Sequence, residues 1–174
     1  MRTLLALLIL FAAVPAVHAA PALQLAGRVT DDARILSGSQ KANITARLVD
    51  LERTRGYQVV VVTVDSLGGQ EIAQFTRDLG NAWGIGRKGL DDGVILLVAP
   101  KERKVRIEVG QGLEQTLTDE KAEAIIASHI LPHFRGGDLP KGISSGVDAV
   151  IAALDPKAAK ARSPVRPVAQ AASR

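Results

Sequence analysis

The chain contains no cysteine. Disulfide bonds, a bacterial lipoprotein anchor and cysteine catalysis are therefore excluded. The fold has to be stabilised by its hydrophobic core alone.

The sequence also lacks any long apolar run after its first residues. At the start, a single arginine, an apolar stretch at 4–14 and small residues up to Ala19 have the layout of a secretory signal peptide. The stretch is shorter than the roughly 20 residues that span a bilayer, and nothing comparable follows. We expect a signal peptide at 1–19, cleaved after Ala19 or Ala20, a periplasmic location, and no transmembrane anchor in the mature chain.

The formal net charge of +4 comes from the end of the chain. Residues 155–174 carry five basic residues and one acid, so the preceding domain is close to neutral. A neutral domain has no basic footprint, and we expect no nucleic-acid partner. Because the end segment is rich in Ala, Pro and Arg, the sequence predicts one domain at 20–154 and a disordered basic tail at 155–174.

Residue periodicity and capping patterns predict seven elements in this domain. They are a helix at 37–56, a strand at 57–64, a helix at 72–83, hairpin strands at 93–99 and 105–109, and helices that begin near Thr118 and Asp138. Strand–helix–strand crossovers are right-handed, and the later helices can cover the other face of the sheet. We therefore expect an α/β fold, a three-layer α/β/α sandwich with a small mixed central sheet and helices on both faces.

Two short motifs resemble known catalytic or binding signatures but lie in the wrong context. Residues 84–89 fit G-x-G-x-x-G, yet a helix precedes them and a strand follows, which is the reverse of a dinucleotide site. We expect no nucleotide there, only a helix stop and a loop with positive φ angles. Residues 142–146 fit G-x-S-x-G, but no strand precedes Ser144 and no histidine follows it, so we expect small residues on a helix face.

His129 and His133 are four residues apart and could share a zinc ion on one helix face. Pro132 lies between them and is expected to end the helix, so that His133 falls beyond regular structure. No third ligand is spaced with them. Surface histidines at a helix end are the simpler interpretation.

Carboxylates offer the best remaining chemistry. Asp31 precedes the first helix, Asp91 and Asp92 enter the first hairpin strand, and Glu114 follows the second. The last three meet at one end of the antiparallel hairpin, where oxygen ligands could bind a hard cation such as Ca²⁺ or Mg²⁺. The alternative for each aspartate is a turn or a helix cap.

The chain also resembles a known family over residues 27–154. The matching pieces include Trp-Gly-Ile-Gly at 83–86, Asp-Asp-Gly-Val at 91–94, Val-Gly-Gln-Gly-Leu-Glu at 109–114 and Phe-Arg-Gly-Gly-Asp at 134–138. They are similar to the TPM domain of bacterial envelope and thylakoid-lumen proteins. The resemblance implies an α/β/α domain, divalent-metal binding through the acids Asp31, Asp91, Asp92 and Glu114, and assembly or repair of membrane-protein complexes.

Two functions of different classes follow from these residues and from the resemblance. In the first, the domain is an accessory factor that binds Ca²⁺ (or Mg²⁺) and a membrane-protein or envelope partner without turnover. In the second, the metal assists a phosphomonoesterase-type phosphatase. The first is preferred, since the sequence shows no identifiable nucleophile or paired base and no catalytic residue can be named.

Overall fold

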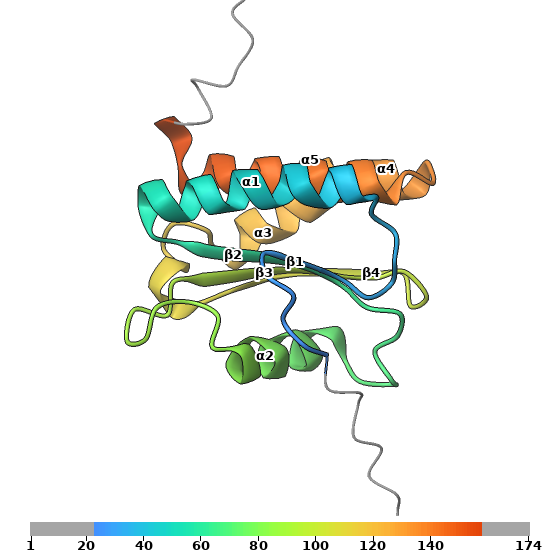
Figure 1. The fold of residues 1–174 in the computed structure, drawn as a ribbon, viewed down its shortest axis with the longest axis horizontal. Coiled ribbons are helices and arrows are strands. Elements are labelled where there is room, and N and C mark those ends of the chain that lie inside the picture. The colour runs from blue at the N-terminus through green and yellow to red at the C-terminus, as the bar shows by residue number, and fades with distance from the viewer. Residues whose placement is uncertain (1–22, 158–174) are drawn as a thin grey trace, which may run out of the picture.

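The computed structural model describes residues 23–157, and the predicted signal peptide and most of the predicted tail lie outside them. The described chain is an α/β/α sandwich, which confirms the expected fold (Figure 1). In order, its elements are β1 Val29–Asp31, α1 Gly38–Arg55, β2 Gln58–Thr63, α2 Ile72–Trp83, β3 Gly93–Ala99, β4 Lys104–Val109, the 3-10 helix η1 Gln111–Leu113, α3 Asp119–Ile125, the π-helix η2 Ile126–Ile130, α4 Leu131–Arg135 and α5 Leu139–Leu154. None of the helices within 23–157 has the length and apolarity needed to span a bilayer.

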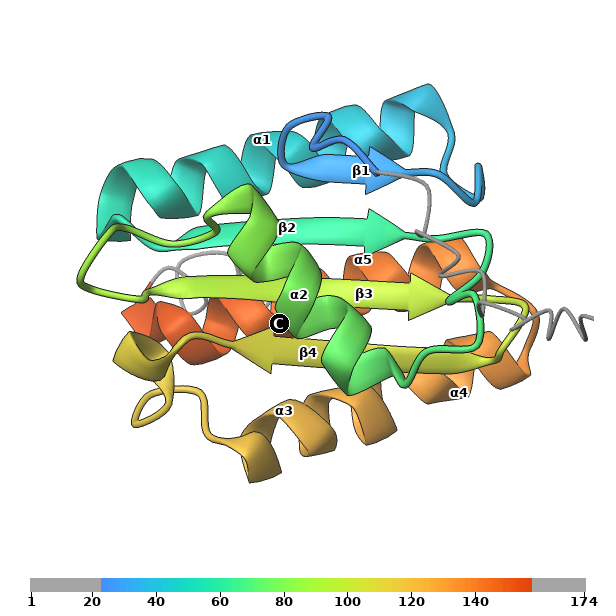
Figure 2. The same ribbon diagram turned by 90° about the horizontal axis from the view of Figure 1, so that it is seen from below.

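The sheet has four strands in chain order, with β1, β2 and β3 parallel and β4 antiparallel. Strand β1 was missed in the sequence because three residues, Val-Thr-Asp, show no period. In Figure 2, α2 lies in front of the sheet and α1 behind it, while β1 to β3 point the same way. The β2–α2–β3 crossover is therefore right-handed as expected, whereas the β1–α1–β2 crossover is left-handed, a rare arrangement.

Each face of the sheet has its own hydrophobic core. The larger core joins alternate residues of β2 and β3, such as Val61 and Leu96, to α1, α3 and α5. The smaller core joins the intervening residues, such as Val60 and Leu97, to α2 and to neighbouring loop residues such as Leu67. Burying each such aliphatic side chain stabilises the fold by about 1.5 to 3 kcal/mol, so both faces of β2 and β3 contribute.

The helix ends follow the sequence signals closely. Ser37 caps α1 in a capping box with Gln40, and Gly56 ends it in the left-handed region at φ 78°. Gly84 ends α2 in the same way at φ 61°, as expected. Trp83 packs against the smaller core, and its indole N–H donates to the carbonyl of Leu23 at 3.0 Å.

The expectation that Pro132 ends the third helix was wrong. The chain stays helical through α3, η2 and α4, and Pro132 lies in the first turn of α4. The π turn of η2 directly precedes the proline and widens the helix where a regular turn would bring its ring against a carbonyl. His133 consequently lies within α4.

Candidate functional site

Two glycine-rich loops pack against each other where β3 begins and β4 ends. A Cβ on Gly110 would lie 2.0 Å from the carbonyl oxygen of Asp91, and one on Gly112 would lie 1.9 Å from that of Leu90. Only glycine allows this approach of two backbones. The loop at 84–93 also has positive φ at Gly86 and Gly89, as the sequence predicted for the G-x-G-x-x-G segment.

These loops and α2 enclose a pocket of about 400 Å³. Its charged lining side chains are Arg77, Asp91, Glu108 and Glu114. The hairpin register, which pairs Val94 with Val109, places Asp91 and Glu114 just outside the same end of the sheet. The sequence-based expectation that these two acids share one edge is therefore met by their positions.

The three acids of the pocket differ in what they already bind. Glu108 accepts from Arg106 Nε at 2.6 Å and lies 3.6 Å from Arg77 Nε. The exposed carboxylates of Asp91 and Glu114 have no hydrogen-bond or ion-pair partner among residues 23–157. The pocket therefore holds two uncompensated carboxylates beside one neutralised by arginine.

Asp92 points away from this pocket into the protein. It is 3% exposed, and its two oxygens accept from the backbone N–H of Arg87 at 2.7 Å and from Arg87 Nε at 2.6 Å. Burial raises the pKa of Asp92, but the side-chain and backbone hydrogen bonds from Arg87 outweigh it and leave that pKa below its ordinary value. The sequence predicted Asp92 as a metal ligand, and in the structure its oxygens hold the loop at 84–93.

Asp31, which the sequence grouped with the same site, lies at the opposite end of the sheet from Asp91. Because β1 and β3 are parallel, Asp31 ends one strand while Asp91 precedes the start of the other. Its carboxylate accepts from the backbone N–H groups of Ile35 and Leu36, both at 3.1 Å, and from the Thr63 hydroxyl at 2.7 Å. Asp31 therefore has the turn role that was one of the alternatives from sequence, while Ser37 is the cap of α1.

The other side chains that could bind a metal ion do not lie together in one site. No cluster of three or more His, Cys, Asp or Glu side chains suited to holding a metal ion occurs in the described part of the chain. His129 is exposed in η2 and His133 is half-buried in α4. A site at Asp91 and Glu114 would therefore need backbone or water oxygens as further ligands.

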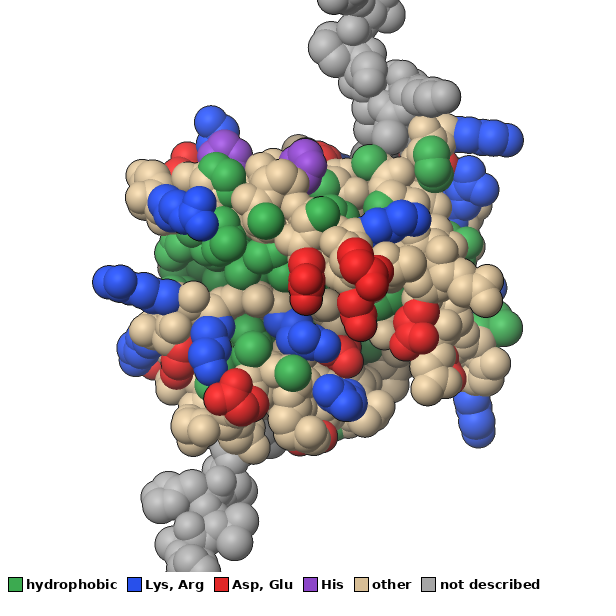
Figure 3. Space-filling view, turned by 180° about the vertical axis from the view of Figure 1, so that it is seen from behind, with side chains coloured by type: hydrophobic (Ala, Val, Ile, Leu, Met, Phe, Trp, Pro, Cys, Tyr) green, Lys and Arg blue, Asp and Glu red, His purple; other side chains and the backbone are tan. Residues whose placement is uncertain are grey.

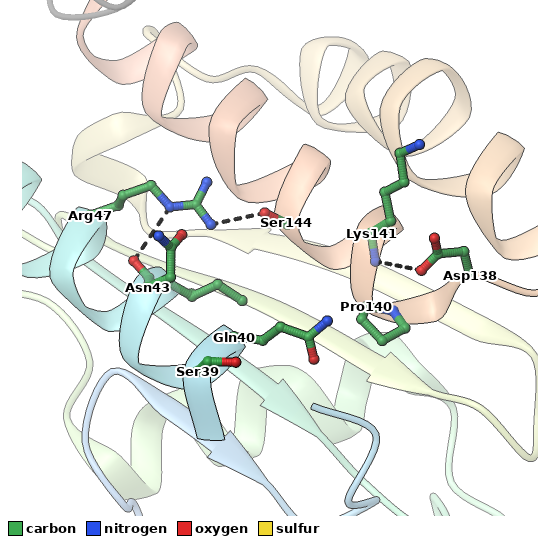
Figure 4. A pocket seen from close by; sticks show the side chains of 9 residues that line it. Ser39, Gln40, Asn43, Arg47, Asp138, Pro140, Lys141 and Ser144 are labelled. Atoms are coloured by element: carbon green, nitrogen blue, oxygen red, sulfur yellow. Dashed lines mark hydrogen bonds between the residues drawn. The ribbon is translucent and has the colours of Figure 1, made fainter. Parts of the chain in front are cut away.

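A polar hollow of about 350 Å³ lies between the N-terminal halves of α1 and α5 (Figure 4). Arg47 crosses it and donates to Ser144 Oγ at 2.9 Å and to Asp148 at 2.5 Å. Asp138 accepts from the backbone N–H of Lys141 as the cap of α5. These groups join and cap the helices. Ser144 lies inside α5, so G-x-S-x-G is a helix face, as expected, and no nucleophile elbow.

Sequence reasoning missed Glu108 and Arg77 as parts of the pocket. Glu108 pairs with Ile95 across the hairpin, and this register could have been anticipated once the hairpin was recognised. Arg77 lies on α2, and no local pattern shows which face of the sheet α2 covers. The close glycine contacts had a signal in the two glycine-rich loops, but the pairing of those loops needed the fold.

Comparison with known proteins agrees with this architecture. The family model of the TPM domain matches residues 29–153. The N-terminal domain of a protein from P. gingivalis is 37% identical, with a TM-score of 0.70 over 74% of this chain and 82% of that one. No curated protein matches the chain.

Two more distant structures share the fold. The N-terminal domain of a Corynebacterium glutamicum protein is 21% identical, with a TM-score of 0.60 over 86% of this chain and 90% of that one. The BA42 protein from Bizionia argentinensis is 18% identical, with a TM-score of 0.59 over 68% of this chain and 81% of that one. Given the family match over most of its length, the chain belongs to the TPM domain family.

Proposed function

We propose that this protein is an exported, divalent-cation-binding accessory factor that acts on an envelope or membrane-protein partner. The observation that carries the proposal is the pair of carboxylates, Asp91 and Glu114, which line one pocket and bind no group of the described chain. Ca²⁺ (or Mg²⁺) is the cation whose chemistry fits oxygen ligands of this kind.

The backbone at Asp91 supports a role for its side chain. Asp91 adopts φ 48°, a left-handed conformation that glycine or asparagine occupies more readily. Such an outlier points to a requirement at that position. Here the turn separates the two neighbouring acids, so that Asp92 is buried on Arg87 while Asp91 lines the pocket.

Electrostatics favours the same ligand. Asp91, Glu114 and Glu108 bring negative charge to a pocket in which only Arg77 is cationic. A bound cation offsets the repulsion between the two unpaired carboxylates. Ca²⁺ takes six to eight oxygens in flexible geometry, so carbonyl and water oxygens can complete a site that has only two free carboxylates.

The lining of the pocket gives no reason to prefer the phosphatase alternative. The hydroxyl-bearing side chain that lines the pocket is Thr76. Thr76 is fully buried, and its hydroxyl donates to the carbonyl of Ile72 at 2.6 Å. A covalent mechanism would need an activated nucleophile with a base beside it. Assays with a phosphomonoester on the purified protein, with and without Ca²⁺, test this alternative directly.

Calcium titration tests the site. A ligand that binds only the folded protein stabilises it by mass action, by about 1.4 to 2.7 kcal/mol at ten to a hundred times the Kd. We expect Ca²⁺ to raise the Tm of the protein and to shift the amide resonances of residues 89–93 and 110–114. Asp91→Asn combined with Glu114→Gln should abolish both effects.

Glu123→Gln is the matched control, because Glu123 is an exposed acid on α3 outside the pocket. It should keep the full calcium response. A rise in Tm that persists in the Asp91→Asn, Glu114→Gln variant would contradict the proposal. So would amide shifts confined to His129 and His133.

The periplasmic location is part of the proposal and rests on the signal-peptide pattern before Ala19. Mass spectrometry of the protein from its native host measures the first residue of the mature chain. A protein that retains Met1 contradicts export by cleavage.

A further inference from the structure

An apolar groove of about 550 Å³ lies at the other end of the hairpin from the acidic pocket. It is formed by the β3–β4 turn, by α4 and by the start of α5. Its apolar walls include Pro100, Leu131, Phe134 and Leu139. Figure 3 shows on this side of the molecule a hollowed hydrophobic patch with basic side chains around it.

The groove depends on the close packing of α4 against α5. A Cβ on Gly142 would lie 2.5 Å from the ring of Phe134, and one on Gly146 would lie 2.6 Å from Ile130. Glycine at 142 lets the Phe134 ring lie against α5 and form a wall of the groove, and glycine at 146 lets Ile130 of η2 pack against the same helix. The apolar wall is therefore part of the packed fold and is formed before any partner arrives.

Three cations border the groove and no acid lines it. Arg103, Lys104 and Arg135 are the charged lining residues. Lys104 lies 3.3 Å from Glu71, whereas Arg103 and Arg135 are exposed and have no acidic partner within residues 23–157. Arg103 also adopts φ 54° in the turn, a conformation that favours glycine, so its side chain is presented at a strained position.

The geometry points to a docking site for a short acidic, apolar peptide segment of a protein partner. Side chains the size of Leu or Phe would fill the groove, and neighbouring Asp or Glu residues, or a C-terminal carboxylate, would pair with Arg103 and Arg135. Charged rims of this kind choose the partner and speed its association, and the buried apolar contact supplies most of the affinity.

Charge and shape separate this occupant from others. The C-terminal residues 158–174 are basic, so the rim repels them. A planar bilayer is contacted by protruding apolar side chains, but the large hydrophobic residues most exposed in 23–157 are Leu25, Val49 and Leu90, none of which lines the groove. The apolar side chains of the groove are recessed, so a protruding side chain of a peptide can insert between them.

The groove specifies the kind of partner that the proposed accessory function requires, and peptide binding there does not depend on the metal site. The groove lies beside the β3–β4 turn, next to the Ala99–Lys104 pair of the hairpin. The acidic pocket lies at the other end of the hairpin, next to the Val94–Val109 pair. The Asp91→Asn, Glu114→Gln variant should therefore bind peptide normally. Loss of the calcium response alone would leave the groove intact, and loss of peptide binding alone would leave the metal site intact.

Selection from a random phage-displayed peptide library against the purified protein tests the proposal. The enriched peptides should place Asp or Glu beside Leu, Ile or Phe. The best of them, synthesised with a fluorescein label, should shift amide resonances at 99–104 and 131–139. In Arg103→Ala combined with Arg135→Ala, the Kd should rise about tenfold, as expected from losing two rim ion pairs.

Lys88→Ala is the matched control, because Lys88 is an exposed cation in the loop at the opposite end of the sheet. It should leave the Kd unchanged. Both arginines are exposed, so the double variant should keep its circular dichroism spectrum and Tm. Replacing Glu by Lys in the peptide should raise the Kd for the unmodified protein by more than the double variant does, because repulsion is added to the loss of the ion pairs.

Three results would overturn the proposal. The first is that enriched peptides lack acids or map outside the groove. The second is that the protein binds phosphatidylglycerol vesicles through Arg103 and Arg135 while no acidic peptide is enriched, which identifies a membrane surface as the occupant. The third is self-association in light scattering that the double variant abolishes, which identifies a second copy of the chain.

Discussion

Replacing Gly110 by alanine tests the contact between the two loops that form the acidic pocket. Gly110 has an ordinary backbone, at φ −69°, so glycine is needed there for space and not for conformation. The added Cβ would lie 2.0 Å from the Asp91 carbonyl oxygen and 2.8 Å from its carbon. Carbon–oxygen contacts normally begin at about 3.3 Å, so one backbone has to move by roughly 1.3 Å.

That displacement has a calculable cost. It breaks or lengthens the bonds from Gly110 N–H to the Gly93 carbonyl at 2.8 Å and from Gly112 N–H to the Asp91 carbonyl at 3.1 Å. Each is worth about 0.5 to 1.5 kcal/mol, and overpacking adds about 1 to 3 kcal/mol. We expect Gly110→Ala to lower the free energy of unfolding by about 2 to 5 kcal/mol, since alanine also restricts the unfolded chain slightly.

Urea denaturation followed by circular dichroism measures this loss as a lower midpoint. Gly38→Ala is the control, because Gly38 begins α1 and a Cβ there meets nothing within 4 Å. It should leave the stability unchanged or raise it by up to about 1 kcal/mol. Equal midpoints for Gly110→Ala and the unmodified protein would refute the close contact between the loops.

Two further predictions concern Asp92 and Trp83. Asp92→Asn should cost about 1 to 2 kcal/mol at neutral pH, toward the lower part of the range for a charged hydrogen bond because Arg87 is half exposed. Since the folded pKa of Asp92 lies below its ordinary value, its stabilisation is present above about pH 4 and is lost as the pH falls through the folded pKa, so urea midpoints of variant and unmodified protein should converge in acid. Trp83, packed on the smaller core, should be only weakly quenched by iodide, and strong quenching in the folded state would contradict that packing.

Much of the fold could be predicted because its signals are local. A capping box, glycine at two helix ends and the β-branched strand β2 each act through neighbouring residues, and each is where the sequence placed it. Strand β1 could not be found in this way. Its three residues become a strand only by pairing with Val61, Val62 and Thr63, which are distant in the chain.

The candidate site was predicted only in part, for the same reason. The sequence does not distinguish the neighbouring acids Asp91 and Asp92. In the structure, the positive φ of Asp91 leaves its side chain exposed, while Asp92 is buried and bonds Arg87. The end of the sheet at which Asp31 lies depends on the direction of β1, and that direction was unknown because β1 was not predicted. The apolar groove combines segments more than 25 residues apart in the chain, such as Val98 and Leu131, and no window of sequence contains it.

The pairing of the first and last helices has a consequence for how the chain folds. Arg47 bonds Asp148 and Arg55 bonds Asp155, contacts that span 101 and 100 residues. Helix α5 also provides Ile143, Val147, Val150, Ile151 and Leu154 to the larger core. Residues such as Leu48 and Leu96 therefore stay uncovered until the last helix has been synthesised, and the domain cannot close from its N-terminus as it emerges. A chain exported as proposed before its last helix is complete would reach its translocation machinery with that core still open.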